Sequence, residues 1–245
     1  MMLRGFNTDL HIHTCLSPCG MPENVPTRIV QRARERDLQV IGICDHNASE
    51  NVGAVRAAAT RWHINVLGGM EITTQEEIHI LAMFDSDDDL NQMQHLVYEH
   101  LPGVNDPQAF GQQYIVDAED YVKGFNERLL MGATDLSLEV VIAAIHSAHG
   151  LAIASHIDRE AFSLFSQLGM IPEHLELDAV ELSPHFMNSK FHLEKVVYPR
   201  VYFSDAHRPD DVGRAHTRFL IETPCVSEIK LALQGRDGRR ILPVD

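Results

Sequence analysis

Short apolar runs alternate with amphipathic segments along most of the 245-residue chain. The apolar runs predict strands, because β-branched and apolar residues suit the buried strands of a sheet. They lie near Leu10–His13, Val40–Cys44, Val66–Glu71, Ile78–Phe84, Leu151–Ser155, Ala179–Ser183, Val201–Ser204 and Thr217–Ile221. Helical spacing of apolar residues predicts helices over Pro26–Asp37, Val52–Trp62, Leu136–His149 and Val226–Leu233. This alternation predicts an α/β fold with a mainly parallel sheet or barrel.

The stretch from Asp85 to Ala133 departs from this alternation. Its acidic beginning predicts a helix that continues to His100, because negative side chains are stabilised at a helix N-terminus. Residues 102–107 contain proline and glycine and predict a loop, and residues 114–122 predict a hairpin. We therefore expect a single domain over residues 1–245, with residues 85–133 as an insertion that forms a lid or a dimer contact.

Charge and hydropathy narrow the range of partners. The formal net charge of −15 disfavours an extended nucleic-acid interface, because an acidic surface repels the phosphate backbone. No apolar run approaches the ~18 residues that a membrane helix needs, and the N-terminus lacks the apolar centre of a signal peptide. We expect a cytoplasmic protein with no membrane contact, and the acidity does not argue against a small phosphorylated ligand.

Candidate metal ligands stand at the ends of nearly all the predicted strands, in a chain with 15 histidines. The C-terminal ends of the strands of a parallel barrel meet at one face, and residues two apart on a strand point the same way. A single HxH or a lone Asp-His pair has ordinary structural explanations, whereas the whole series in this order favours one metal centre. Histidine and carboxylate ligands suit zinc, manganese or iron. The candidates are His11, His13, Asp45, His46, Glu71, His79, His156, Asp205 and His207.

In this order the motifs resemble those of the PHP family, named for polymerase and histidinol phosphatase, from Asp9 to about Gly213. The resemblance implies a distorted (β/α)7 TIM-like barrel that carries two or three divalent metal ions. It implies that Glu71 bridges two ions and that Asp45 supports the metal-binding His46. The ligands implied in this way are His11, His13, His46, Glu71, His79, His156, Asp205 and His207.

The loop after the first predicted strand departs from the family pattern. Many members place an aspartate, followed by glycine, where this chain has Pro18. Cys19 as a thiolate, Glu23 or Cys15 could replace that carboxylate as a metal ligand. A sulfur ligand would favour zinc or iron over manganese.

This ligand set predicts a metal-dependent phosphoric ester hydrolase. Two ions bridged by Glu71 would acidify a bridging water, and the resulting hydroxide would attack the ester. We predict that Glu71, Asp205 and His207 are catalytic. Arg159 is predicted to bind phosphate through its forked guanidinium, and His185 to donate a proton to the leaving group. A small-molecule or nucleotide phosphate is the preferred substrate.

Three alternatives stay open at this stage. An amidohydrolase-type barrel also opens with HxH, although the pair Asp205-x-His207 and the ligand-like His46 argue against it. A nuclease that acts on short single strands would use the same two-metal chemistry on diesters. A non-catalytic metal-binding module would keep the ligands and lack activity.

Overall fold

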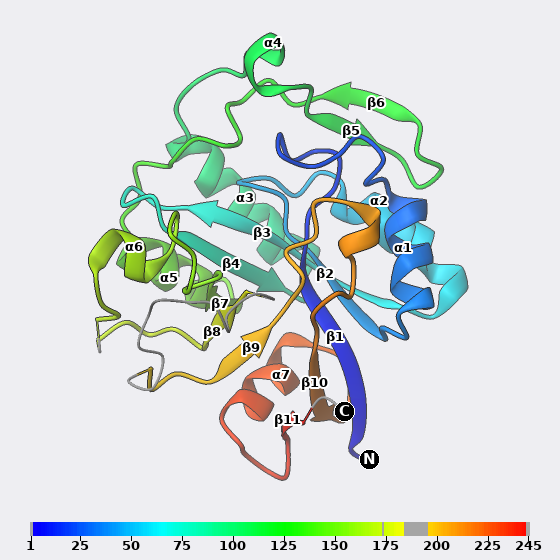
Figure 1. Ribbon diagram of the computed structural model, residues 1–245, viewed down its shortest axis with the longest axis vertical. Coiled ribbons are helices and arrows are strands. Elements are labelled where there is room, and N and C mark those ends of the chain that lie inside the picture. The colour runs from blue at the N-terminus through cyan, green and yellow to red at the C-terminus, as the bar shows by residue number, and fades with distance from the viewer. Residues whose placement is uncertain (1, 173, 184–195, 244–245) are drawn as a thin grey trace.

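The computed structural model describes residues 2–172, 174–183 and 196–243, and nine strands of this part form one sheet (Figure 1). The strand order is β11–β10–β1–β2–β3–β4–β7–β8–β9. Eight of these strands coincide with the eight predicted ones, and β11 adds a short edge beside β10. Their bounds are β1 Arg4–Ile12, β2 Val40–Ile43, β3 Asn65–Thr73, β4 His79–Phe84, β7 Leu151–Ala154, β8 Ala179–Leu182, β9 Arg200–Tyr202, β10 Thr217–Ile221 and β11 Arg240–Leu242.

The sheet is mixed rather than wholly parallel. Strands β1, β2 and β3 are parallel to one another, and so are β7, β8 and β9, whereas β4 runs antiparallel to β3 and β7. Residues 74–78 between β3 and β4 form a turn, which is too short for the crossover that parallel strands need. The α/β class is confirmed. A regular (β/α)7 alternation is not, because no helix separates β3 from β4.

The sheet curls until the segment after β9 meets β1. The backbone N–H of His13 donates to the carbonyl of Ala206 at 3.0 Å, and Ala206 N–H donates to the carbonyl of His11 at 3.1 Å. The buried Asp9 carboxylate accepts a hydrogen bond from the Ser204 amide at 3.0 Å. Strand ends from both halves of the sequence therefore surround one centre.

Helices cover the sheet, and α3 begins as its acidic composition predicts. The Ser86 side chain accepts hydrogen bonds from the amides of Asp88 and Asp89 at the start of α3. Among the helices of the described ranges, none is long and apolar enough to cross a bilayer. Their bounds are α1 Pro26–Glu35, α2 Val52–Ala59, η1 Thr60–Trp62, α3 Asp87–His100, α4 Pro107–Phe110, α5 Leu138–Ser147, α6 Leu164–Leu168, η4 Pro209–Asp211 and α7 Val226–Leu233.

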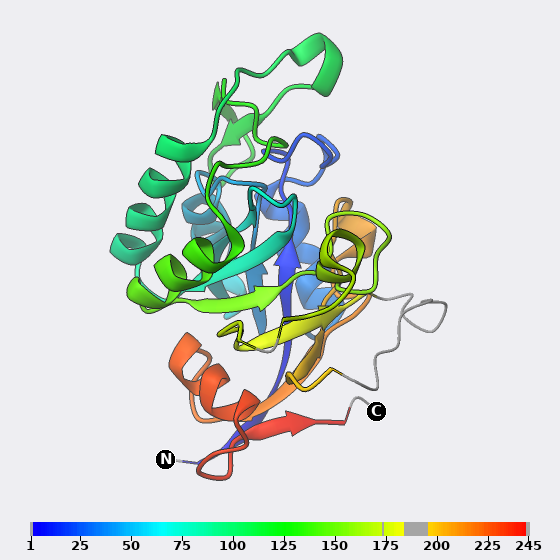
Figure 2. The ribbon, with the colours of Figure 1, turned by 90° about the vertical axis from the view of Figure 1, so that its left-hand side faces the viewer.

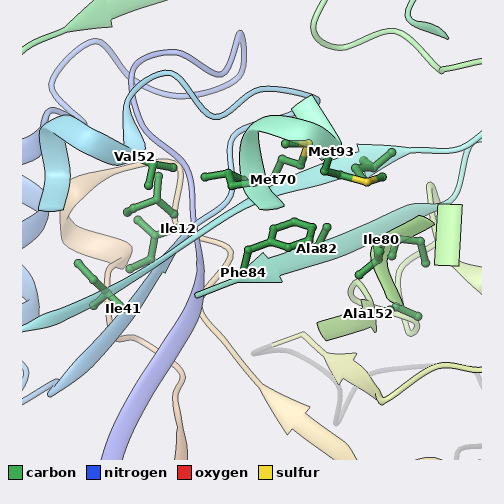
Figure 3. Close-up of a cluster of buried hydrophobic side chains, with 14 of the residues drawn as sticks. Ile12, Ile41, Val52, Met70, Ile80, Ala82, Phe84, Met93 and Ala152 are labelled. Carbon is green, nitrogen blue, oxygen red and sulfur yellow. The ribbon is translucent and has the colours of Figure 1, made fainter. Parts of the chain in front are cut away.

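Two large apolar clusters use opposite faces of the same strands. Along β4, Ile80, Ala82 and Phe84 join the cluster that also contains side chains of α2 and α3 (Figure 3). Leu81 and Met83 point the other way and join a second cluster that includes side chains of α7. This alternation follows from the two-residue period of a strand. It explains why all six residues of β4 are buried.

The segment predicted as an insertion has two parts. Helix α3 packs Leu90 and Met93 into the main apolar cluster. After it, α4 and a hairpin of β5 (Tyr114–Val116) and β6 (Val122–Phe125) lie at the end of the molecule opposite α7 (Figure 2). Asn51 donates a hydrogen bond to the backbone of β5 and accepts another from it, each at 3.0 Å. The role of the hairpin as a lid or dimer contact stays a prediction.

Candidate metal centre

Eight side chains from six strands or their ends converge at one edge of the curled sheet. They are the eight His, Glu and Asp residues that the sequence predicts as ligands. Because β4 is antiparallel to its neighbours, His79 reaches this edge from the start of its strand. The donor sets whose atoms lie within 4.8 Å of one another are His13/His46/His207, His11/His13/Glu71/Asp205 and His46/Glu71/His79.

The buried Glu71 carboxylate lies between two groups of histidines. Its Oε1 lies 3.1 Å from Nδ1 of His79 and 3.2 Å from Nε2 of His156. Its Oε2 lies 3.1 Å from Nδ1 of His46 and 3.5 Å from Nε2 of His13. The two oxygens of one carboxylate thus face different rings, which is the geometry that a carboxylate bridging two cations needs.

Asp205 completes the centre from the segment after β9. Its Oδ1 lies 3.2 Å from Nε2 of His11 and 3.1 Å from Nε2 of His13. The His207 ring stacks on His13 with the ring centroids 4.2 Å apart. Asp205 and His156 have φ values of 48° and 26°, in a region that non-glycine residues rarely occupy. Such strain is commonly retained at functional sites, where the surrounding structure holds it.

Glu181 on β8 orients the His11 ring. Its carboxylate oxygens lie 2.9 and 3.0 Å from Nδ1 of His11, and one of them accepts a hydrogen bond from the His156 amide at 3.2 Å. An ionised carboxylate only accepts, so Nδ1 of His11 carries a proton and Nε2 faces the centre. Glu181 was noted from the sequence as a potential ligand at a strand end, but it was not among the ligands that the family resemblance implied. The sequence feature that points to Glu181 is its place as an acidic residue within an apolar run. In the structure all four residues of this run, Ala179–Leu182, are buried.

A second relay orients His13. The Ser17 hydroxyl donates its proton to Asp45 Oδ1 at 2.6 Å, and Nδ1 of His13 lies 3.0 Å from the same hydroxyl. Because the serine has one proton to give, Nδ1 of His13 must donate to it and Nε2 faces the centre. Asp45 also accepts from the amide and hydroxyl of Thr14 at 2.7 and 2.8 Å. The contacts of Asp45 thus lead to His13 through Ser17, whereas the expectation was that Asp45 supports His46, and the role of Ser17 was not predicted.

Several polar atoms of the centre are buried without a hydrogen bond from any described residue. Three of them are Oε1 of Glu71, Nδ1 of His46 and Nδ1 of His79. Each is near the others, but the geometry does not align a donor with an acceptor. Buried polar atoms without partners are costly, and nitrogen and carboxylate donors are the ligands that zinc, manganese and iron take. The residues therefore fit divalent metal ions.

The electrostatics of the centre favour positive charge. Burial lowers the pKa of His11, but the carboxylates of Glu181, Asp205 and Glu71 outweigh it and hold that pKa well above its usual value. Burial lowers the pKa of His13 to about 4, and repulsion between His13 and His207 acts in the same direction. Burial opposes ionisation of Glu71, yet the surrounding histidines lower its pKa well below the usual range. At neutral pH the Glu71 carboxylate is thus ionised and His13 offers a lone pair.

A pocket of about 490 Å³ opens onto this centre. Cys19, predicted as a ligand, lines the pocket but does not join any donor set found among the described residues. Of the other loop candidates, Glu23 is exposed and Cys15 is buried, with its Sγ 3.9 Å from the Tyr114 carbonyl of β5. The pocket is lined by Cys19, His46, Glu71, His79, Met131, His156, Arg159, Glu160, Ala161, Phe162, Asp205 and His207.

Of the two predicted substrate-binding residues, Arg159 and His185, Arg159 lies in the described part of the chain. The Arg159 guanidinium pairs with the Asp205 carboxylate at the pocket, and 42% of its side chain is exposed. Arg159 thus brings a positive charge beside the centre, although the ion pair is its observed contact. His185 lies outside the described residues.

Comparison of the sequence with models of known protein families identifies the family of this chain. A family model of the PHP domain matches residues 9–186, which is most of the chain. The chain belongs to the PHP domain family. The resemblance noted from the motifs is therefore confirmed.

Individual relatives share this fold or part of the sequence. A lesion-specific endonuclease from Pyrococcus furiosus superposes with a TM-score of 0.72 at 17% identity, over 97% of this chain and 58% of that one. An amidohydrolase from Chromobacterium violaceum, solved with bound sulfate, superposes with a TM-score of 0.54 at 20% identity, over 84% and 90% of the two chains. A 5′-3′ exoribonuclease of Haemophilus influenzae is 32% identical over 78 residues, 31% of this chain and 27% of that protein. The chain thus corresponds to parts of the two nucleases.

Proposed function

We propose that this chain is a metal-dependent phosphoester hydrolase with its active site in the pocket over Glu71. The observation that carries the proposal is the Glu71 carboxylate, whose two oxygens face separate histidines in a fully buried setting. Two or three bound zinc, manganese or iron ions would polarise the phosphate and activate a water molecule as nucleophile. Membership of the PHP domain family supports a hydrolase that uses such ions.

The protein's own residues would prepare this chemistry in three ways. The eight convergent His, Glu and Asp side chains would hold the ions, with Glu71, Asp205 and His207 nearest the reacting group. Glu181 would fix the ring of His11, which keeps its Nε2 aimed at the centre. Arg159 would bind a phosphate oxygen, because a guanidinium offers paired donors for such an oxyanion.

The pocket supports a small phosphorylated substrate, up to a nucleotide. Its volume of about 490 Å³ lies within the range of ~300–1,000 Å³ that is usual for small-ligand sites. The net charge of −15 works against a long polyanion that would need an extended contact surface. We therefore propose a phosphate ester of low molecular mass as the substrate.

A second candidate, a nuclease that acts on short single strands, is favoured by two of the relatives. One is a lesion-specific endonuclease and the other a 5′-3′ exoribonuclease. Hydrolysis at a strand end would place one nucleotide in the pocket and leave the rest of the strand outside it. This candidate therefore needs the same centre and differs in the substrate.

The test combines metal analysis with hydrolysis of a phosphate monoester, a phosphate diester, a short single-stranded RNA and an acyl amide. Glu71→Gln is compared with Glu99→Gln, which changes an exposed carboxylate of α3. We expect at least two ions per chain in the wild type. In Glu71→Gln, metal should be lost and activity should fall more than about 100-fold, beyond the usual effect of groups that only support a ligand. Glu99→Gln should resemble the wild type.

Each alternative has its own outcome. Cleavage of the RNA without the monoester would favour the nuclease. Cleavage of the amide alone would favour an amidohydrolase. A metal-loaded protein that cleaves none of the four would indicate a metal-binding module, and a protein that binds no metal would refute the proposal.

A further inference from the structure

An aromatic side chain lies exposed in the pocket, directly beside a predicted metal ligand. Phe162, on the loop between β7 and α6, lines the pocket and is 40% exposed. Its ring stacks on the His79 ring, with centroids 4.7 Å apart and 16° between the ring planes. The His79 amide donates to the Phe162 carbonyl at 3.1 Å. The phenyl ring is therefore held next to the centre while much of its surface stays open.

Folding stability alone does not favour this arrangement. Burying a phenylalanine side chain is worth ~1.5–3 kcal/mol, part of which Phe162 forgoes. Its φ of 56° lies in the left-handed region, where a bulky side chain is strained. An exposed ring on a strained backbone, next to a polar centre, points to a role in binding.

The rest of the pocket wall suits a ligand that is partly apolar. Met131, from the segment after the hairpin, is 44% exposed and lines the same pocket. Its flexible thioether adapts to the shape of a bound group and makes favourable contacts with aromatic rings. Arg159 supplies the positive charge of the wall. One pocket thus combines the metal centre, a cation and two exposed apolar side chains, Phe162 and Met131.

We propose that Phe162 stacks on the base of a nucleotide substrate and makes the pocket select nucleotides over phosphorylated sugars. This inference rests on the proposed phosphoester hydrolysis and adds a determinant of specificity to it. Nucleobases stack readily on aromatic side chains because every base presents a flat π face. If the phosphate binds at the centre, the attached nucleoside can extend along the pocket wall and reach the Phe162 ring.

The experiment compares two substrates that differ by the base alone, adenosine 5′-monophosphate and ribose 5-phosphate. The readout is the ratio of their kcat/KM values with metal-loaded protein, in the wild type, Phe162→Leu and Phe162→Tyr. Phe125→Leu is the matched control, because Phe125 is 51% exposed on β6 and is not among the residues that line the pocket. Ratios cancel any general effect that a change at Phe162 has on His79.

We expect the wild type to prefer adenosine 5′-monophosphate and Phe162→Leu to lower the ratio about 5- to 30-fold, mainly through KM. This range corresponds to the loss of ~1–2 kcal/mol of base stacking. Phe162→Tyr and Phe125→Leu should keep the wild-type ratio. Equal losses on both substrates in Phe162→Leu would mean that the ring supports His79, and an unchanged ratio would mean that it contacts no base. Either result overturns the proposal.

Two further arms separate the possible failures. p-Nitrophenyl phosphate tests whether any aromatic ester benefits, and an equal loss for this compound in Phe162→Leu would overturn selectivity for nucleobases. Titration calorimetry of the two 5′-phosphates reads the binding difference without turnover. If the protein hydrolyses neither these compounds nor the diester and RNA of the earlier test, the proposed function fails, while tighter binding of the nucleotide that depends on Phe162 would still support the stacking.

Discussion

Replacing Glu181 with glutamine probes how the metal centre is prepared. The carboxylate is fully buried, and both its oxygens lie within 3.0 Å of Nδ1 of His11. Glutamine keeps the size of the side chain but removes the negative charge and lets its amide group turn either way. The proton on Nδ1 of His11 would no longer be fixed, and Nε2 would spend part of its time protonated and unable to bind a metal.

We expect Glu181→Gln to weaken metal binding about 10- to 100-fold, the usual effect of removing a group that orients a metal-binding histidine. This corresponds to ~1.4–2.8 kcal/mol of binding free energy. Titration with a competing chelator measures the affinity, and activity should return when metal is in excess. Glu228→Gln is the control, because Glu228 pairs with Arg239 away from the centre. Wild-type affinity in Glu181→Gln, with the fold intact by circular dichroism, would refute the role of Glu181.

Three further predictions concern stability. Asn47→Ala should lower the free energy of unfolding by ~2–4 kcal/mol in urea titrations. The Asn47 amide donates hydrogen bonds to the carbonyls of Leu130 and Gly132, which would lose this donor. The φ of 51° at this position is left-handed, a conformation that asparagine tolerates better than alanine. Burial opposes ionisation of Asp178, but hydrogen bonds from His146 and the backbone outweigh it and lower its pKa. Asp178→Asn should therefore cost ~1 kcal/mol at pH 7, and the difference should shrink as the pH falls from about 3.8 through the lower pKa of the folded state. Adding zinc or manganese to chelator-stripped protein should raise the Tm. When the free metal concentration is about 100 times the Kd, binding should add ~2.7 kcal/mol to the free energy of unfolding.

Each of these three stability predictions has an outcome that would contradict it. An Asn47→Ala protein as stable as the wild type would mean that the loop beside β5 and β6 does not depend on this side chain. A difference at Asp178 that persists in acid would mean that the charge is not its source. A Tm that does not respond to metal would contradict binding to the folded protein.

The sequence predicted most strands and the convergence of the ligands because both depend on local patterns. Apolar runs identify buried strands, and the ligands follow those runs at spacings of one or two residues. Glu71 stands near the end of such a run, whereas His79 stands at the start of one and was assigned to the centre through the family resemblance. The helix α3 was predicted from its acidic start for a similarly local reason.

Other features depend on contacts between distant residues. The direction of β4 is set by a short turn, and neither its apolar run nor its length reports direction. β11 has three residues and is defined by pairing with β10, which no local pattern indicates. Glu181 and Ser17 act through hydrogen bonds to rings far away in the sequence. These groups could be assigned only once the curled sheet had brought them together.

The meeting of β1 with the segment after β9 has a consequence for how distant parts of the chain are held together. His13 and Asp205 contact each other although 192 positions separate them in the sequence. An ion held by both would act as a reversible cross-link that closes a very long loop. Because the ion is released when the chain unfolds, its contribution to stability grows with the free metal concentration, as for any ligand that binds only the folded state. Ions bound for hydrolysis would thus also hold distant parts of the chain together, and their loss would loosen the curl of the sheet.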